Sequence, residues 1–247
     1  MSFLASRARA APGGFGTPLK RQEDPRLITG RGRFSDDFTL PGQAYACFVR
    51  SPHSHARIRA IDAADALAVP GVLAVLTGRD AADDGLADIP HRPVPTNPNE
   101  FPLGGPEGAP IFVAPYPPLP ADRARFAGEA VAMVVAETAA LAADAAGQVR
   151  VDWEPLPAVT ATRDAAAAGA PVLWEGLGGN VCVDSLAGDA RAADAAFAAA
   201  AHVVRIDTWV PRITGVPMEP RAALGVHDAA TGRLTLYAGS GGALFSR

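Results

Sequence analysis

Two histidines, His53 and His55, occupy alternate positions in the segment 48–62. Alternate side chains of an extended strand project to the same side, so this spacing could place two imidazoles on one metal ion. No third ligand stands nearby, and residues 51–54 (Ser-Pro-His-Ser) have the composition of a turn. We therefore expect a hydrogen-bonded turn here and no metal site.

Glu219 is the carboxylate that comes closest to the pattern of a general base. It stands between Met218 and Pro220, and a carboxylate at the mouth of a strand can serve as a proton acceptor beside a pocket. The competing interpretation is positional, with Glu219 lining a substrate channel or a joint between domains. We expect the positional role and assign no catalytic residue.

Two cysteines and one glycine run are weaker candidates for chemistry. Cys47 and Cys182 are too few and too isolated for an iron–sulfur cluster or a disulfide framework. We expect them to be buried, reduced thiols. The run Gly13-Gly14-Phe15-Gly16 has the letters of a cofactor-binding loop. Because such a loop needs a strand before it and none is indicated, we expect no function there.

Four charged residues near the N-terminus, Arg31, Arg33, Asp36 and Asp37, could form ion pairs or contact another subunit. Exposed ion pairs contribute only ~0–1 kcal/mol, so a solvated surface is the default expectation. The alternative is a structural or interfacial role.

The elements that would position these residues begin with two β-favouring segments, 43–50 and 55–61. The turn between them predicts an antiparallel hairpin or a bulged pair. A helix over 62–68 should follow, with Asp62 as its N-cap and Pro70-Gly71 as its stop signal. Residues 72–76 predict a further strand.

Residues 78–120 are rich in proline, glycine, aspartate and asparagine and lack periodicity, which predicts a long loop. A loop of that length is uncommon in a compact domain unless it is functional. Two interpretations stay open here. The loop wraps a partner or borders a substrate funnel, or it is a surface excursion.

Order resumes with a strand over 125–135, interrupted at Gly128-Glu129, a helix over 138–147 and a strand over 149–153. Thr138 and Gly147 are the expected caps of the helix. Strand, helix and strand in this order predict a mixed α+β domain.

The rest of the chain predicts a second, incomplete domain. After a connector at 176–179 we expect a helix over 190–201 and a strand over 202–210. A hairpin of 222–226 and 233–238 should turn at 229–232. The expected organisation is an N-terminal arm (1–22), a first domain (23–165) and a connector with part of a second domain (166–247).

Several sequence blocks together resemble the large, molybdopterin-binding subunit of the xanthine dehydrogenase, aldehyde oxidase and carbon monoxide dehydrogenase family. They occur in the family's order and spacing from about residue 20 to residue 247. The blocks are 23–34 with Asp36-Asp37, 48–62, 70–78, 126–131, 151–157, Gly188-Asp189 and 217–221. Each block alone is weak, but so many in the right order indicate kinship.

The resemblance implies a fold class, α+β, and an assignment for each domain. Residues 23–165 would form the α/β hammerhead domain, and 166–247 the connector and the beginning of the first molybdopterin-binding domain. Relatives place a glutamine beside the metal's oxo ligand where Gly241-Gly242 stand here. Because glycine has no side chain for that bond, two alternatives stay open: the backbone amides of Gly241 and Gly242 contact the cofactor instead, or this subfamily binds its cofactor differently.

The resemblance also implies an activity. A molybdenum–molybdopterin cofactor would oxidise an aldehyde or an N-heterocyclic substrate with water-derived oxygen, and electrons would leave through Fe–S clusters and FAD on other subunits. Complete family members are much longer. We therefore expect the N-terminal portion or a split subunit, inactive alone and completed by the remaining molybdopterin-binding subunit, an Fe–S subunit and an FAD subunit.

The alternative is a non-catalytic hammerhead scaffold, or a truncated product, whose proline-rich loop binds another protein. A large exposed apolar surface near residues 205–247 would favour a missing partner over this scaffold.

Composition excludes several other classes. The net charge of −4 leaves no broad basic face, so we expect neither nucleic acid nor a membrane surface as partner. No stretch approaches the roughly 20 consecutive apolar residues of a membrane span. The N-terminus lacks the apolar segment of a secretion signal, which predicts a cytoplasmic protein. Because only 6% of residues are aromatic, we expect a core of small side chains.

Overall fold

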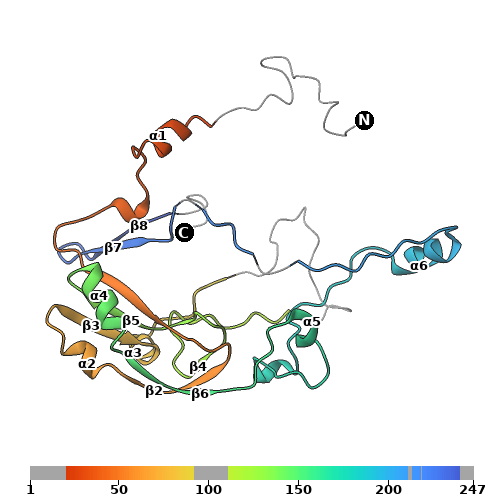
Figure 1. The fold of residues 1–247 in the computed structure, drawn as a ribbon, viewed down its shortest axis with the longest axis horizontal. Coiled ribbons are helices and arrows are strands. Elements are labelled where there is room, and N and C mark those ends of the chain that lie inside the picture. Colours follow the sequence, from red (N-terminus) through yellow and green to blue (C-terminus); the bar gives the residue numbers. More distant parts are fainter. Residues whose placement is uncertain (1–20, 92–110, 211–212, 218, 240–247) are drawn as a thin grey trace. The chain divides into compact units, whose positions relative to one another are not determined.

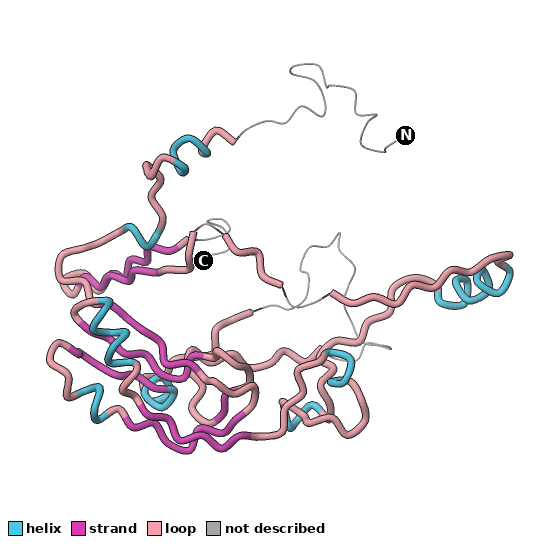
Figure 2. The backbone as a smooth tube through the Cα atoms, viewed as in Figure 1, coloured by secondary structure: helices cyan, strands magenta, loops and turns pink. Residues whose placement is uncertain are grey.

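The structure is a computed structural model that describes residues 21–91, 111–210, 213–217 and 219–239 (Figure 1). The chain divides into two compact units, one formed by 42–207 and the other by 1–41 together with 208–247. Figure 2 shows how strands and helices are distributed along the backbone. No helix among the described residues is long and apolar enough to cross a membrane.

The unit 42–207 contains two three-stranded sheets and several short helices. In chain order its elements are β1 (Tyr45–Arg50), β2 (Ala56–Asp62), α2 (Ala64–Leu67), β3 (Val72–Thr77), α3 (Gly78–Asp83), β4 (Arg123–Ala124), β5 (Ala130–Ala136), α4 (Ala139–Ala146), β6 (Arg150–Pro155), α5 (Thr162–Ala165), η3 (Glu175–Leu177) and α6 (Ala190–Ala199). The other unit contains α1 (Asp24–Ile28), η1 (Ser35–Asp37), β7 (Ala223–Asp228) and β8 (Arg233–Ala238).

The two sheets have the strand orders β1-β5-β3 and β4-β2-β6, and every pair in them is antiparallel. Strand β5 is central and reads Ala-Val-Ala-Met-Val-Val-Ala, with buried or half-buried residues throughout. Such a continuous apolar run is typical of a strand that is covered on both faces. Helix α4 packs against β5 and against its neighbour β1.

Side chains from both sheets and from two helices share one hydrophobic core. Its buried members are Ala66 on α2, Val134 on β5, Ala145 on α4, and Val149. Half-buried residues pack around them, including Val49, Ile61, Val72, Val75 and Val151. The core is thus built from alanine and β-branched residues, as the low aromatic content predicts.

The predicted hairpin of 43–50 and 55–61 is wrong. Strand β1 pairs with β5 in one sheet, whereas β2 pairs with β4 and β6 in the other. The connection between β1 and β2 is a corner. There the Ser51 amide donates to the Glu129 carbonyl (2.8 Å) and the Gly128 amide to the Ser51 carbonyl (2.7 Å). Gly128 has φ +92°, a conformation that glycine adopts readily.

The same corner explains the interruption expected at Gly128-Glu129 in the strand 125–135. Only the part after the interruption is a strand, because β5 begins at Ala130, whereas residues 125–127 are irregular and the short strand β4 ends before them at Ala124. Residues 125–129 therefore cross from one sheet to the other alongside residues 51–55. Two neighbouring stretches of chain turn this corner together.

Most predictions from local signals are confirmed. Strands β3, β6, β7 and β8 and helices α4 and α6 occur where they were expected. Helix α4 is capped by Thr138, whose hydroxyl accepts a hydrogen bond from the Leu141 amide (3.2 Å). Helix α2 is shorter than predicted because Asp62 still belongs to β2. The Asp62 carboxylate nevertheless accepts a hydrogen bond from the Ala64 amide (3.0 Å).

One further prediction of secondary structure is wrong, and another is wrong in part. Residues 202–210 are irregular and no strand pairs with them in the described chain, although their composition favours β structure. The expected loop 78–120 begins with helix α3. At the start of α3, the Asp80 carboxylate accepts hydrogen bonds from the Thr77 amide (2.7 Å) and hydroxyl (2.6 Å). Residues 92–110 of the expected loop lie outside the described residues.

The expected domains, 23–165 and 166–247, stay predictions. The two compact units divide the chain by the contacts between its residues, which is a different criterion. Their borders fall after residues 41 and 207. Nearly all of the expected arm 1–22 lies outside the described residues.

Candidate functional site

The two expected cofactor contacts, Gly241 and Gly242, lie outside the described residues, as does the glycine run 13–16. The described chain that leads to them is the end of β8 at Gly239. The residues around this strand end are therefore the described part of the chain that lies nearest in sequence to the expected contacts.

Glu219 joins three segments of the unit 1–41 with 208–247. Its Oε1 atom accepts hydrogen bonds from the Ser35 amide (3.0 Å) and from the Ser35 hydroxyl (2.9 Å). At the end of β8, a Cβ placed on Gly239 would lie only 3.0 Å from the same oxygen and 3.1 Å from the Glu219 Cδ atom. Ser35, the first residue of η1, and Gly239, the residue that follows β8, thus both lie against the half-buried carboxylate of Glu219.

The packing beside Glu219 gives two of the four charged residues a local structural role. The rings of Phe38 and Tyr237 stack at 5.8 Å, which places the segment after η1 against β8. The Arg33 guanidinium lies 4.5 Å from the centre of the Phe38 ring. The Asp37 carboxylate accepts a hydrogen bond from the Phe34 amide (2.8 Å) and so closes the turn of η1.

Among the described residues, the polar contacts of the outer charged residue Arg31 are local. Its Nε donates to the Thr29 hydroxyl at 3.1 Å, and that interaction is exposed. The solvated surface expected by default therefore describes Arg31 better than it describes Arg33 or Asp37.

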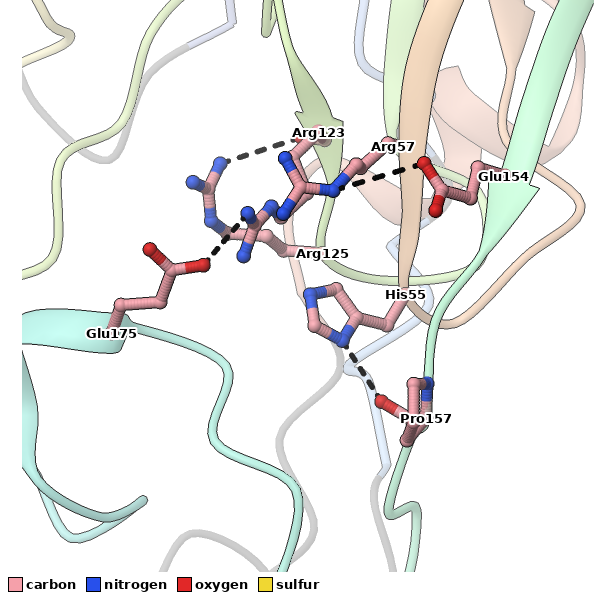
Figure 3. Close-up of polar contacts among 7 residues, drawn as sticks. All are labelled: His55, Arg57, Arg123, Arg125, Glu154, Pro157 and Glu175. Atoms are coloured by element: carbon pink, nitrogen blue, oxygen red, sulfur yellow. Dashed lines mark hydrogen bonds and ion pairs between the residues drawn. The ribbon is translucent and has the colours of Figure 1, made fainter.

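A second polar cluster lies in the unit 42–207, where β4 meets the connector (Figure 3). Arg123 on β4 is 7% exposed, and its Nη2 donates to the Glu175 carboxylate at 2.9 Å. The Arg125 guanidinium lies 3.9 Å from the centre of the Trp174 ring, a cation–π geometry. Neighbouring connector residues are thereby fastened to a strand about fifty positions earlier in the chain.

Burial and charge shift two acid–base equilibria in this arginine cluster. Burial lowers the pKa of Arg125, and the carboxylate of Asp122 opposes that shift. The hydrogen bond from Arg123, and then the charge of Arg123, lower the pKa of Glu175. Both groups remain ionised at neutral pH, so the cluster is a charged clamp and not a proton-transfer site.

The neighbouring Glu129 shows the opposite shift. Burial raises the pKa of its carboxyl group, and the hydrogen bond from the Arg125 amide counteracts this. Its Oε2 accepts that bond at 2.5 Å. Glu129 is 9% exposed and lies at the corner between the sheets, where its main-chain carbonyl also binds Ser51. We interpret it as part of the corner's structure.

The two histidines have separate partners. His55 is 6% exposed, and its Nδ1 donates to the Pro157 carbonyl at 2.9 Å (Figure 3). The His53 ring meets the Trp153 ring edge-on at 5.6 Å. The expected turn is confirmed, because the His53 amide donates to the Ser51 hydroxyl (3.1 Å). Within the described ranges, no group of three or more His, Cys, Asp or Glu residues is arranged to hold a metal.

The expectation of two buried thiols is wrong. Cys47 is half-buried on β1, and Cys182 is exposed. Cys182 lies in the irregular chain after η3, where its carbonyl accepts a hydrogen bond from the Phe112 amide (3.0 Å). Both thiols are free.

The sequence did not single out Arg123, Trp174 or Glu175. The alternation of Arg123 and Arg125 was visible, but nothing local connects it to a Trp-Glu pair in a distant connector. The Ser35–Glu219 contact was equally hidden, because its partners are 184 positions apart.

Comparison with known proteins identifies the chain. Residues 29–157 match the family model described as aldehyde oxidase and xanthine dehydrogenase, a/b hammerhead domain. That match covers more than half of the sequence. The chain belongs to the aldehyde oxidase and xanthine dehydrogenase family. Residues 174–245 match the molybdopterin cofactor-binding domain, so the expected fold class and order of domains are both confirmed for this family member.

Individual relatives in the family agree. The chain is 34% identical over 226 residues to the 6-hydroxypseudooxynicotine dehydrogenase complex subunit gamma of Paenarthrobacter nicotinovorans, covering 90% of this chain and 26% of the relative. It is 36% identical over 224 residues to the nicotine 6-hydroxylase large subunit of the same organism, covering 90% and 25%. The chain thus spans about a quarter of the length of these family members.

A solved structure gives the same result. Quinoline 2-oxidoreductase from Pseudomonas putida 86 matches with a TM-score of 0.70 and 37% identity, over 90% of this chain and 26% of that one. The shared architecture therefore extends beyond the hammerhead match into the region of the cofactor-binding domain.

The described residues of this family member do not by themselves fit a molybdopterin. A cavity of about 160 Å³ beside Gly78 offers Arg59 and Arg79, but it is smaller than the roughly 300–1,000 Å³ of a cofactor pocket. A cavity of about 530 Å³ is lined by residues of 165–181 and carries no charged side chain for a phosphate. We therefore assign no reaction step to the described residues.

Proposed function

We propose that this chain is the amino-terminal part of the molybdopterin-binding subunit of a molybdenum hydroxylase. One observation carries the proposal. The hammerhead match (29–157) is followed by the cofactor-domain match (174–245), and the relatives are molybdenum-enzyme subunits of which this chain covers about a quarter. In this reading the molybdenum cofactor supplies the redox chemistry, and the chain contributes the structural frame at one side of it.

The substrate class that we propose is an aldehyde or an N-heterocycle. Two relatives are named for nicotine and quinoline, which are N-heterocyclic compounds. These names favour a heterocyclic substrate for the complete enzyme. Gly241 and Gly242 remain the proposed cofactor contacts, through their backbone amides.

The proposed partners are the remaining molybdopterin-binding part, an Fe–S subunit and an FAD subunit that carry electrons away. Relatives named as a complex subunit gamma and as a large subunit support an assembly of several chains. We place the assembly in the cytoplasm, which subcellular fractionation of the native source tests.

A run of exposed apolar side chains supports an assembly over an independent scaffold. Its members are 58% to 84% exposed, and they are Val203, Val204, Ile206, Trp209, Val210, Ile213 and Val216. We call residues 203–210 together with 213–216 the apolar run. Monomeric proteins rarely leave so many large apolar residues in water, and such surfaces mark interfaces.

The hairpin β7–β8 also supports an assembly of several chains. It is a sheet of two strands, and its Leu234 and Leu236 are 80% and 70% exposed. A two-stranded sheet is marginally stable unless another layer covers it. A further protein layer over the hairpin would supply that cover.

Purification from the native source under mild conditions tests the proposal. We expect the polypeptide that carries this sequence to copurify with Fe–S and flavin proteins, identified by mass spectrometry and by their absorption spectra. Recovery of the chain alone, folded and without redox partners, would favour the scaffold.

A further inference from the structure

We propose that the cavity of about 160 Å³ in the unit 42–207 is a binding site for a small organic carboxylate, held by Arg79 and Arg59. All of the lining residues belong to the described chain. The inference goes beyond the proposed function and does not depend on it, because binding at this cavity requires no molybdopterin.

The first support is a cavity whose walls are fixed. Three segments line it, namely 58–61 on β2, 77–79 at the start of α3, and 120–121. The Ile58 amide donates to the Asp122 carbonyl at 2.8 Å, which ties the third segment to β2. A Cβ on Gly78 would lie 2.6 Å from backbone atoms of Pro120 and Ala121, so α3 packs directly on the same segment. The cavity is therefore preformed, and a ligand loses little affinity to reorganisation of its walls.

The second support is a β-bulge at Arg59. The pairing of β2 with β6 shifts register between Ile58 and Ala60, which leaves Arg59 without a partner in that ladder. On its other edge, β2 pairs with β4 only at Ala56 and Arg57. Bulges re-aim side chains and are frequent next to functional sites. The bulge thus places an arginine at the cavity, where no further strand of the described chain covers that edge of β2.

The third support is positive charge that is only partly neutralised. Arg79 forms no ion pair within the described chain, and its acidic neighbour Asp80 instead accepts hydrogen bonds from the Thr77 amide (2.7 Å) and hydroxyl (2.6 Å). Arg59 contacts Glu154 at 3.2 Å, but that pair is exposed and contributes little. Each guanidinium has five N–H donors, so an anion can bind Arg79 and share Arg59 with Glu154.

The size and the apolar lining of the cavity restrict the class of ligand. Ile58 and Ile61 are half-buried and Pro120 is buried, so part of the ligand contacts apolar groups. An apolar cavity of about 150 Å³ can hold benzene, which makes a single ring the upper size here. A more highly charged inorganic phosphate would lose more hydration against such walls than a carboxylate would. A monocarboxylate with a small apolar body fits these conditions best.

Equilibrium dialysis of the native protein that contains this chain against labelled benzoate tests the site. We expect Arg79→Gln to raise the Kd of about one benzoate per copy of this chain by roughly 10-fold or more, because a charged hydrogen-bond donor is lost. Benzyl alcohol, which has a similar size but no charge, should compete for this site at least about 10-fold more weakly than unlabelled benzoate. Inorganic phosphate should compete as weakly as benzyl alcohol.

Arg191→Gln is the matched control. Arg191 is also an exposed arginine near the start of a helix, α6, but it lies outside the cavity. The substitution removes the same charge and should leave the Kd for benzoate unchanged. Thermal unfolding followed by circular dichroism verifies that both variants are folded.

Absence of saturable benzoate binding in the unsubstituted protein would overturn the inference, and an unchanged Kd in Arg79→Gln would place the ligand elsewhere. An equal loss of affinity in Arg79→Gln and Arg191→Gln would show that the charge of the whole surface holds the ligand. Competition by inorganic phosphate as strong as that by benzoate would contradict a carboxylate site with an apolar lining. None of these results bears on the proposed function, because none of them measures molybdenum or pterin.

Discussion

The most unusual residue of the hammerhead region is Arg123, a cation that is nine-tenths buried but whose partner is not. The Glu175 side chain is 75% exposed, and the Arg123 Nε has no hydrogen-bond partner among the described residues. A buried cation with one external partner depends strongly on that partner, because losing it leaves the charge uncompensated. Glu175 therefore holds the connector to β4 through an interaction that water can reach.

We expect Glu175→Gln to remove part of the acid sensitivity of folding. The hydrogen bond from Arg123, and then its charge, keep the pKa of Glu175 below the ordinary glutamate value. The unfolded chain then binds this proton more readily than the folded chain. The stabilisation is complete above the ordinary pKa and is lost as pH falls through the lowered pKa.

Denaturant midpoints measured from neutral to acidic pH test this expectation. The difference between the native protein and Glu175→Gln should shrink as pH falls. Glu137→Gln, at an exposed glutamate outside the arginine cluster, is the control. A constant difference between native protein and Glu175→Gln at all pH values would contradict the ionic clamp.

At the scale of elements, the start of α3 shows how a proline-rich segment is fixed to the sheets. A Cβ on Gly78 would lie 2.6 Å from backbone atoms of Pro120 and Ala121. The end of the expected loop thus packs directly on the first turn of α3, and Leu119 beside it is buried. Backbone at that distance cannot swing aside as a long side chain can.

We therefore expect Gly78→Ala to lower the free energy of unfolding by about 1–3 kcal/mol, the usual cost of overpacking. Gly176→Ala is the matched control, because a Cβ there has no neighbour within 4 Å. Chemical denaturation of both variants measures the difference. Equal free energies of unfolding for Gly78→Ala and Gly176→Ala would show that residues 111–120 can move away from α3 without cost.

Elements with local signals were predictable from the sequence, whereas pairings between distant strands were not. Thr138 and Gly147 bracket α4 in the sequence, and the helix forms between them. The corner at Ser51 has the composition of a hairpin turn, but its partner is Gly128, far along the chain. Helix α3 was missed although Thr77 and Asp80 form a recognisable cap, because the surrounding composition suggested a loop.

In the candidate site, too, contacts between distant segments could not be predicted from the sequence. The interpretation of Glu219 as positional rested on the family resemblance, which places the catalytic base elsewhere, and its partner Ser35 could not be inferred from spacing. The strand expected over 202–210 failed for a related reason. A strand requires a partner, and the described chain offers none to that segment.

At the scale of the whole molecule, the apolar run is the feature that most needs an explanation. Val204, Ile206 and Val210 are each more than 80% exposed. Ordering this segment costs conformational entropy, and its apolar side chains gain no burial in return while they remain in water. We therefore infer that another part of the assembly covers the segment.

We expect the double substitution Val204→Ser and Ile206→Ser to weaken this assembly by 10-fold or more, since each removes about 1.5–3 kcal/mol of burial at an interface. Leu186→Ser is the control, because Leu186 is also exposed (73%) but lies outside the apolar run. Copurification yield and analytical ultracentrifugation measure the effect. Equal loss in both variants, or none in either, would contradict a specific interface at the apolar run.

The molybdenum and pterin content of the native complex tests most directly the claim that this chain works within a molybdenum hydroxylase. Metal analysis and pterin fluorescence, both normalised to this chain, should give about one molybdenum and about one pterin per copy. A folded native complex that contains this chain but neither molybdenum nor pterin would contradict the claim.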